Sequence, residues 1–344
     1  MRGRGLDLES GLIDLTHGAG GRATAKLVSE LFQRAFANPI LAQQNDAALL
    51  ELPPGRVVMS TDAFVVSPLF FPGGDIGQLA VHGTVNDLAM AGARPLYLTA
   101  SFILEEGLAL RDLARIVESM AAAARDAEVL VVAGDTKVVE RGKGDGVFVT
   151  TAGVGVVPPG VTPPGGQRAR PGDAVLLSGY IGDHGMAILS CRRGLEFESP
   201  ILSDTAPLGG LVAAMTAAVP DLHVLRDPTR GGLATTLNEI ATQSSVGIRI
   251  RERDVPVRAA VHAACELLGL DPLYVANEGK LLAVCAAEDA PRLLAVMRAH
   301  PRGQDAALIG EVVEDPDHLL ELATSFGGNR ILEWLSAEQL PRIC

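Results

Sequence analysis

Cysteine is scarce in this sequence. Only Cys191, Cys265, Cys285 and Cys344 occur among 344 residues, and they form neither a CxxC pair nor a cysteine–histidine spacing. A zinc ribbon and a disulfide framework are therefore not indicated. We expect reduced thiols, which are typical of a cytoplasmic protein.

Long apolar runs and an excess of positive charge are also missing. No stretch reaches the roughly 18 uninterrupted apolar residues of a membrane-spanning helix, and the amino-terminal MRGRGLDLES lacks the apolar centre of a signal peptide. The chain carries 29 Lys and Arg against 41 Asp and Glu, a formal net charge of −12. Because phosphate-backbone binding requires a basic face, we expect no nucleic-acid partner. The missing apolar stretches predict that the protein does not associate with a membrane.

The chain does contain enough apolar sequence for two ordinary domains, since 48% of its residues are hydrophobic and 20% are charged. The segment PPGVTPPGGQRARPGD, residues 158–173, is rich in proline and glycine, which break both helix and strand. We therefore place a linker there. The resulting division is a glycine-rich amino-terminal segment (1–45), an amino-terminal domain (46–157), the linker, a carboxy-terminal domain (174–330) and a tail (331–344).

Hydrophobic periodicity predicts a mixture of strands and helices on both sides of the linker. In the first half we expect strands at 56–66, 96–104, 127–134 and 146–157 and helices at 22–36, 75–91 and 109–126. In the second half we expect strands at 174–178, 246–251, 280–286 and 307–313 and helices at 183–193, 208–218, 231–243, 257–269 and 287–299. Two halves of similar make indicate a duplicated α+β or α/β architecture with a site between them.

A glycine-rich stretch, THGAGGRATAKL, lies near the amino terminus and contains His17, Gly18, Gly20 and Gly21. It formally fits a dinucleotide fingerprint, but any preceding strand is very short and the expected acidic residue does not follow. No Lys-Ser or Lys-Thr pair follows the glycines, which excludes a Walker A loop. Two interpretations remain, a simple turn or a flap over phosphates into which His17 reaches.

Five aspartates stand in apolar or strand-end contexts: Asp46, Asp62, Asp87, Asp135 and Asp227. A single such residue is most often a helix cap or a satisfied polar contact. Five of them, each within two residues of Asn, Thr or Gly, also match a set of ligands for a hard cation. Magnesium favours carboxylates together with substrate phosphates.

Three further stretches combine acid, base and glycine. GDTKVVERG contains Lys137 and ANEGKLL contains Glu278, so a cation for phosphates and a base are available. In DPTRGGLATTL, Arg230 and Gly231 open an expected helix, an arrangement that suits a phosphate or ribose. Taken alone, Lys137 and Glu278 are each better explained as ordinary surface residues, because surface Lys and Glu are abundant.

Cys344 ends the sequence as the last residue of LPRIC. A frayed end tolerates almost any residue, so the alternatives are an unimportant thiol and a thiol that is used. The fourteen residues from 331 reach at most about 45 Å when extended. Such an arm is long enough to carry a group between an internal site and external partners.

Together these motifs resemble the HypE family of hydrogenase maturation factors, within the PurM-like ATP-binding superfamily. The resemblance runs in order through nearly the whole chain, in the motifs HGAGG, STDAFVVSPLFFPGGDIG, NDLAMAGARP, GDTKVVERG, LSGYIGDHGM, DPTRGGLA, NEGKL, DAALIGEV and PRIC. Several of these motifs also occur in PurM-like kinases and synthetases. The terminal PRIC is the element that discriminates the HypE family from them.

The resemblance implies a fold, a reaction and partners. The fold has two α+β domains of the PurM type, the amino-terminal one pairing in a homodimer and helping to bind ATP and magnesium, with a flexible tail. The carbamoyltransferase HypF loads a carbamoyl group onto the terminal thiol, and ATP then drives dehydration of the S-carboxamide to an S-cyanate. The cyanide passes to iron held by a HypC–HypD complex for nickel–iron hydrogenase.

The resemblance also implies roles for single residues. Catalytic roles fall on Cys344, Glu278 and Lys137, and magnesium ligation on Asp46, Asp62, Asp87, Asp135 and Asp227. Nucleotide contacts fall on His17, Gly18, Gly20, Gly21, Asn86, Thr136, Arg230 and Gly231. This chain reads Asn45-Asp46 where many superfamily members have two aspartates, which leaves the ligand number open. The rival functions are a PurM-like kinase or synthetase acting on a small substrate and a non-catalytic nucleotide-binding scaffold of the maturation complex.

Overall fold

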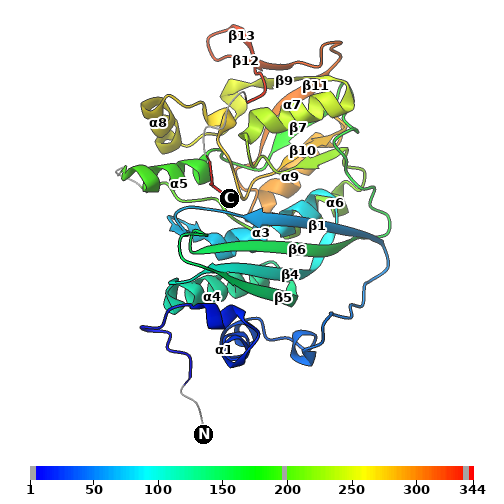
Figure 1. Cartoon of the computed structure of the whole chain (residues 1–344). Coiled ribbons are helices and arrows are strands. Elements are labelled where there is room, and N and C mark those ends of the chain that lie inside the picture. Colours follow the sequence, from blue (N-terminus) through cyan, green and yellow to red (C-terminus); the bar gives the residue numbers. More distant parts are fainter. Residues whose placement is uncertain (1–4, 196–199, 336–340) are drawn as a thin grey trace.

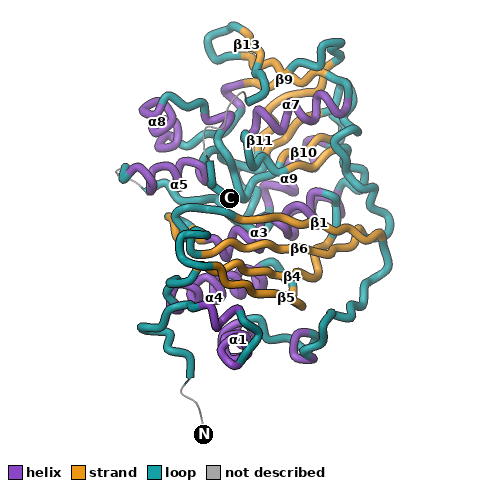
Figure 2. Tube along the Cα trace, viewed as in Figure 1, coloured by secondary structure: helices purple, strands orange, loops and turns teal. Residues whose placement is uncertain are grey.

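The computed structural model describes residues 5–195, 200–335 and 341–344. It consists of two α+β halves stacked on one another, each built around one main sheet (Figure 1). The amino-terminal sheet has four strands in the order β1-β6-β4-β5, and the carboxy-terminal sheet has seven in the order β13-β12-β9-β11-β7-β10-β8. The carboxy-terminal residue lies between the two halves, close to β1 (Figure 2).

The amino-terminal half begins with short helical segments and continues into the sheet. Its elements are η1 (Leu15–Gly18), α1 (Arg22–Leu27), η2 (Val28–Phe32), α2 (Gln33–Ala35), η3 (Leu41–Gln43), β1 (Arg56–Phe64), β2 (Phe70–Phe71), β3 (Gly74–Asp75), α3 (Ile76–Met90), β4 (Arg94–Glu105), α4 (Leu110–Asp126), β5 (Leu130–Val139) and β6 (Val147–Val157). β4 and β5 pair in parallel, and the other neighbours in the four-stranded sheet pair antiparallel.

Helices α3 and α4 cover one face of the four-stranded sheet. Leu113, Ile116 and Met120 recur at helical spacing along α4 and are fully buried. Helix α3 begins at Asp75, whose carboxylate accepts the N–H groups of Gly77 and Gln78. Because α3 also contacts α6 of the other half, it is buried on nearly every side and shows little amphipathic pattern.

The carboxy-terminal half has helices on both faces of its sheet. Its elements are β7 (Ala174–Leu177), α5 (Asp183–Arg193), α6 (Gly209–Ala218), β8 (Val224–Arg226), α7 (Gly232–Ser244), β9 (Gly247–Arg251), η4 (Glu252–Asp254), α8 (Ala259–Leu268), η5 (Pro272–Tyr274), β10 (Leu282–Cys285), α9 (Ala290–Ala299), β11 (Ala307–Val313), β12 (Leu320–Ala323) and β13 (Asn329–Ile331).

Strand β7 shows why a strand of this sheet can have apolar residues at every position. Val175 packs in one hydrophobic cluster with Leu233 of α7, whereas Leu176 packs in another with Leu211 of α6 and Leu293 of α9. Both faces of the strand are therefore buried, and all four residues are apolar.

Most of the expected elements are confirmed, with small shifts of their ends. The expected helix at 22–36 divides into α1, η2 and α2, and the expected strand at 127–134 lies instead at Leu130–Val139. That shift places Asp135, Thr136 and Lys137 inside β5, because pairing with β4 continues to Glu105. The short strands β2, β3, β8, β12 and β13, of two to four residues each, were not expected from the sequence.

Candidate active site: two cavities at opposite edges of one sheet

A cavity of about 740 Å³ lies between β1 and the carboxy-terminal half. Seven of the expected site residues line it, namely Asp62, Asp87, Asp227, Arg230, Gly231, Glu278 and Cys344. Residues far apart in the sequence meet here because β1, α3, the segment before α7 and the segment before β10 each contribute side chains to the cavity lining.

The carboxylates of this cavity repel one another electrostatically. Burial raises the pKa of Asp227 to about 7, and the charge of Asp87 adds to the shift. Burial likewise raises the pKa of Asp62 and of Asp87. Arg230 partly offsets both shifts, and Ser60 donates its hydroxyl to Asp87 at 2.7 Å. The raised pKa values show that the ionised carboxylates are only partly compensated by the neighbouring arginines, so a bound cation would favour their ionised forms.

Glu278 is the most deeply buried acid of the cavity. It is 4% exposed, and its Oε1 has no hydrogen-bond partner among the described residues. Burial raises its pKa well above the usual range, and the charge of Asp227 adds to the effect. Its backbone N–H is held at 3.0 Å by Asp204, which also pairs with Lys280 at 3.0 Å. A buried carboxyl with a raised pKa and a free oxygen is typical of an acid–base group.

Cys344 lies in the same cavity. The N–H of Val65 donates to the backbone oxygen of Cys344 at 3.0 Å, and the N–H of Ser67 donates to Arg342 at 3.2 Å. Ile343, between them, is 5% exposed. Burial raises the pKa of the Cys344 thiol to about 12, and the charge of Glu278 contributes. The thiol is therefore partly buried and protonated in this arrangement.

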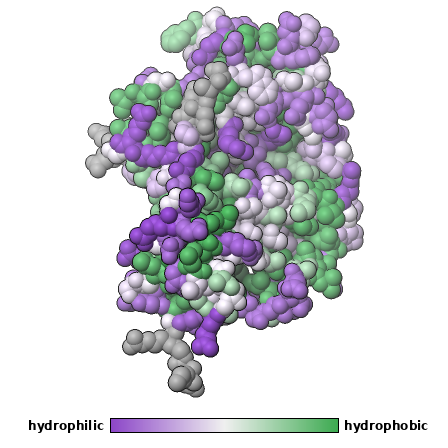
Figure 3. All heavy atoms as spheres, in the orientation of Figure 1, coloured by the Kyte–Doolittle hydropathy of each residue, from purple (hydrophilic) through white to green (hydrophobic). Residues whose placement is uncertain are grey.

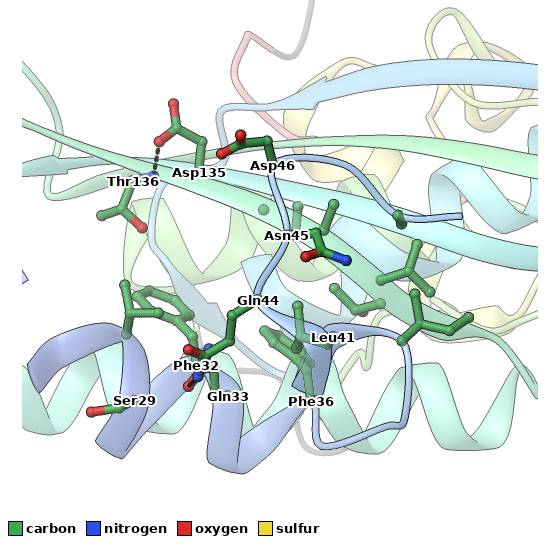
Figure 4. Close-up of a pocket in the computed structure, with 18 of the residues that line it drawn as sticks. Ser29, Phe32, Gln33, Phe36, Leu41, Gln44, Asn45, Asp46, Asp135 and Thr136 are labelled. Atoms are coloured by element: carbon green, nitrogen blue, oxygen red, sulfur yellow. Dashed lines mark hydrogen bonds between the residues drawn. The ribbon is translucent and has the colours of Figure 1, made fainter. Parts of the chain in front are cut away.

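A second cavity, of about 700 Å³, lies at the opposite edge of the sheet, between β5 and the helical segments of the amino terminus. Gly20, Asp46, Asp135 and Thr136 line it. Figure 4 shows Asp46 and Asp135 near one another at one end, while Phe32, Phe36 and Leu41 form an apolar wall at the other. The cavity therefore combines an apolar surface with two carboxylates.

Lys137 lies next to this second cavity, on the open face of the sheet. Its Nζ contacts the Asp135 carboxylate at 2.5 Å, and both side chains are more than half exposed. Within one chain the structure does not bring Lys137 to Glu278, nor Asp46 and Asp135 to the other three aspartates. The expectation of one site formed by all of them is not met in a single chain, because β1 and β5 are the two edge strands.

His17, Gly18, Gly21 and Asn86 lie outside both cavities. His17 accepts the N–H of Asp14 through Nδ1, so it caps η1 rather than reaching outward. Gly18 packs against Val138, and Gly21 precedes α1.

Asn86 is 2% exposed and has a structural set of contacts. Its amide donates to Ala206 at 3.0 Å and accepts the N–H of Leu208 at 2.8 Å. These bonds join α3 to the start of α6. The polar group is therefore satisfied within the protein, the simpler of the two explanations for an Asn in an apolar helix.

Asp204 and His184 were missed in the sequence as site residues. Asp204 holds Glu278 and Lys280, and His184 contacts the backbone oxygen of Ile343 at 2.7 Å. The only sequence signal was a polar SDT triplet in ILSDTAPL and a His in GDHGM. Neither pattern by itself distinguishes a site from a loop.

Both halves match known families. Residues 44–157 match the N-terminal domain of the AIR synthase related proteins, and residues 170–322 match their C-terminal domain. The carbamoyl dehydratase HypE of Azotobacter vinelandii is 67% identical over 98% of this chain and 99% of its own. The chain belongs to the HypE family. The HypE carbamoyl dehydratase of Escherichia coli K12 is 47% identical over 96% of this chain and 99% of its own.

Solved HypE structures have the same fold. A HypE crystal structure in complex with ATP is 54% identical, has a TM-score of 0.92, and matches 96% of this chain and 99% of its own. A HypE–HypF complex contains a chain that is 50% identical with a TM-score of 0.79, matching 90% of this chain and 99% of that one. The two-domain PurM-like α+β fold is confirmed by these matches.

A thiamine-monophosphate kinase of Stenotrophomonas maltophilia is 22% identical with a TM-score of 0.67, over 89% of this chain and 97% of its own. At this identity the likeness shows the fold alone. Within the described residues, no helix of the protein is both long enough and apolar enough to cross a membrane.

Proposed function

We propose that this protein is an ATP-dependent carbamoyl dehydratase that converts an S-carboxamide on Cys344 into an S-cyanate. The observation that carries the proposal is the shared cavity, in which the Cys344 thiol lies with the buried, unpartnered carboxyl of Glu278 and three aspartates. The cyanide then serves as a ligand of iron in nickel–iron hydrogenase. Membership of the HypE family supports this reaction.

Dehydration removes one oxygen and two protons from S–C(=O)–NH₂. Transfer of the terminal phosphate of ATP to the carboxamide oxygen, with loss of one N–H proton, gives an O-phosphorylated imidate and ADP. Loss of the second N–H proton expels phosphate and leaves S–C≡N. Glu278 is the base in this proposal, since a carboxylate whose pKa is raised toward the operating pH removes protons efficiently.

Among the described residues, no three His, Cys, Asp or Glu side chains are grouped closely enough to hold a metal ion by themselves. We propose that the aspartates lining the first cavity bind magnesium together with the phosphates of ATP. Asp62, Asp87 and Asp227 are carboxylates whose pKa values are raised by burial, so bound cation stabilises their ionised forms. Magnesium supplies neutralisation of phosphate charge. Arg230 and Gly231 lie at the start of α7, where Gly231 has a φ of 79° and no side chain caps the helix. We assign phosphate binding to these two residues.

We further propose a homodimer through the open face of the four-stranded sheet. Val57, Met59 and Ile103 on this face are 61%, 72% and 43% exposed. In Figure 3, which views the molecule from this side, apolar side chains lie among the polar ones. An apolar sheet face left uncovered requires a partner layer.

A second copy also completes the site. The two cavities lie at opposite edges of the sheet, next to β1 and β5. Two sheets that pack face to face in opposite order place the β5 edge of one copy near the β1 edge of the other. Asp135, Thr136 and Lys137 of one copy then face the aspartates of the other. In this arrangement Lys137 contacts the phosphates of ATP, and the apolar second cavity binds its adenine ring.

The dimer predicts that a charge on the open face abolishes activity. Met59→Glu introduces a carboxylate into the buried interface, so we expect monomers in light scattering, a retained melting transition and loss of ATP-dependent dehydration. Leu267→Glu is the matched control, because Leu267 is 68% exposed on α8, away from the sheet. A Met59→Glu protein that remains dimeric contradicts this interface.

The aspartate cluster predicts an unusual response of stability to pH. The pKa of Asp227 is about 7 in the folded protein and near 3.8 when unfolded, so its ionisation opposes folding. Without ligand, stability therefore falls as pH rises from about 4 to about 7. At pH 8, Asp227→Asn is expected to raise the melting temperature by a few degrees and to weaken binding of magnesium–ATP.

The control for this measurement is Asp221→Asn. Arg168 donates to Asp221 and lowers its pKa, so this exposed acid favours folding and the substitution is expected to lower the melting temperature slightly. Equal melting temperatures for Asp227→Asn and the parent protein at pH 8 exclude the proposed repulsion.

The remaining partners follow from the reaction. HypF is proposed to load Cys344, in agreement with the solved HypE–HypF complex of relatives, and a HypC–HypD complex is proposed to receive the cyanide. The test is mass spectrometry of the Cys344 peptide after incubation with HypF, its carbamoyl donor and ATP. We expect a carboxamide adduct that loses one water only when ATP is present; an adduct unchanged by ATP rejects the function.

A further inference from the structure

His184 in α5 holds the segment 341–344, here called the terminal segment. The side chain is fully buried, with Nε2 at 2.7 Å from the backbone oxygen of Ile343 and Nδ1 at 2.8 Å from the hydroxyl of Ser203. A carbonyl only accepts, so Nε2 donates and Nδ1 accepts from Ser203. Burial lowers the pKa of His184, which keeps the ring neutral. The two partners therefore select one tautomer.

Ser203 belongs to a triplet that also holds the proposed base. Asp204 accepts the backbone N–H of Glu278 at 3.0 Å. Thr205 contacts Nδ1 of His82 in α3 at 2.9 Å. The triplet Ser203–Asp204–Thr205 thus contacts three parts of the protein: His184, the segment that carries Glu278, and His82 in the amino-terminal half.

We propose that His184 is a positioning residue that seats Ile343 and Cys344 in the cavity, and that Ser203 sets the tautomer it needs. The inference rests on the proposed function, because seating matters only if Cys344 carries the reacting group. His184 touches neither substrate nor reacting atoms; it acts through the carbonyl of Ile343.

Arg192 also binds the terminal segment, at a different position from His184. The guanidinium of Arg192 donates to the backbone oxygens of Ser67, Pro341 and Arg342. It binds the part of the segment nearer to solvent, while His184 binds the buried residue next to the thiol. Removing His184 leaves the Ile343 carbonyl without its donor when seated, which shifts the equilibrium toward release by about 10- to 100-fold.

Seating has a direct consequence for the thiol. In the seated state Cys344 is partly buried, which reduces access of a reagent to the thiol, and burial also raises the thiol pKa to about 12, which reduces the fraction of thiolate. Released Cys344 reacts with an alkylating reagent as an ordinary exposed cysteine does. The rate of alkylation therefore reports the fraction of released terminal segment without any partner, ATP or catalysis.

The experiment measures iodoacetamide labelling of each cysteine by peptide mass spectrometry in the full chain. His184→Phe keeps an aromatic ring but removes the donor, and we expect Cys344 labelling to rise about 10- to 100-fold. His184→Gln keeps an N–H donor and is expected to stay within about threefold of the parent protein. Cys191 is exposed and serves as the internal control for reagent, while buried Cys265 and Cys285 report unfolding.

Unchanged Cys344 labelling in His184→Phe, with Cys265 still protected, overturns the inference. If Cys265 and Cys285 become labelled, the protein has unfolded and Ser203→Ala decides. This smaller change removes the donor to Nδ1, and we expect Cys344 labelling to rise at least about threefold; no rise overturns the inference.

A second readout separates positioning from structure. After loading with a carbamoyl group, His184→Phe is expected to form S-cyanate more slowly by a factor similar to its gain in labelling, whereas its rate of loading by HypF does not fall. His184→Gln restores dehydration. If the parent protein forms no S-cyanate, the proposed function is rejected. The labelling result then still tests, independently, whether His184 positions the terminal segment.

Discussion

Cys344→Ser is expected to leave the protein folded and able to bind ATP while abolishing all formation of S-cyanate. The side chain of Cys344 is partly buried against the core, and serine has nearly the same shape and volume, so we expect the substitution to leave the fold intact. A serine hydroxyl is not a thiolate and cannot replace it as carrier. The measurement is the mass of the carboxy-terminal peptide after incubation with HypF, its carbamoyl donor and ATP.

Cys191→Ser is the matched control, since Cys191 is exposed on α5 and outside the cavity. It should behave as the parent protein does. Cyanide delivery by a Cys344→Ser protein contradicts the carrier role.

The same pair of variants separates the rival functions. A PurM-like kinase or synthetase acting on a small substrate works undiminished without Cys344. A non-catalytic scaffold shows no ATP turnover after carbamoylation, in the parent protein as in the variant. Only the dehydratase couples phosphate release to the state of the Cys344 peptide.

Glu278→Gln is expected to accept the carbamoyl group and to bind ATP, yet to stall before the S-cyanate. Gln does not act as a base at neutral pH, and removal of a general base typically costs about 10²–10⁴ in rate. The stalled species is the carboxamide or its O-phosphorylated form, distinguished by peptide mass. The variant should fold at least as well as the parent, because burial of an ionisable carboxyl at this position is unfavourable.

Glu266→Gln on α8 is the control for loss of one carboxylate, since Glu266 is largely exposed. S-cyanate formation by Glu278→Gln at the parental rate removes Glu278 from the mechanism. The base is then one of the aspartates or a water.

Periodicity and composition determined the elements of this protein. The spacing of Leu113, Ile116 and Met120 predicts α4 because one face of a helix repeats every 3.6 residues whatever lies opposite. Prolines and glycines at 158–173 separate the strands β6 and β7 for an equally local reason. The ordered motifs ending in PRIC determined the family, which the comparisons confirm.

The tertiary structure decided which side chains meet. Asp62 and Asp135 both belong to strands of one sheet, but β1 and β5 are its opposite edges, and strand order is not encoded in local pattern. Lys280 stands two residues after Glu278 in the sequence, yet it pairs with Asp204 in a neighbouring cavity. His184 acquires its contact with Ile343 only because segments 159 residues apart are packed together. Local sequence sets periodicity and turns, whereas burial, charge compensation and hydrogen-bond partners depend on which surfaces the folded chain brings into contact.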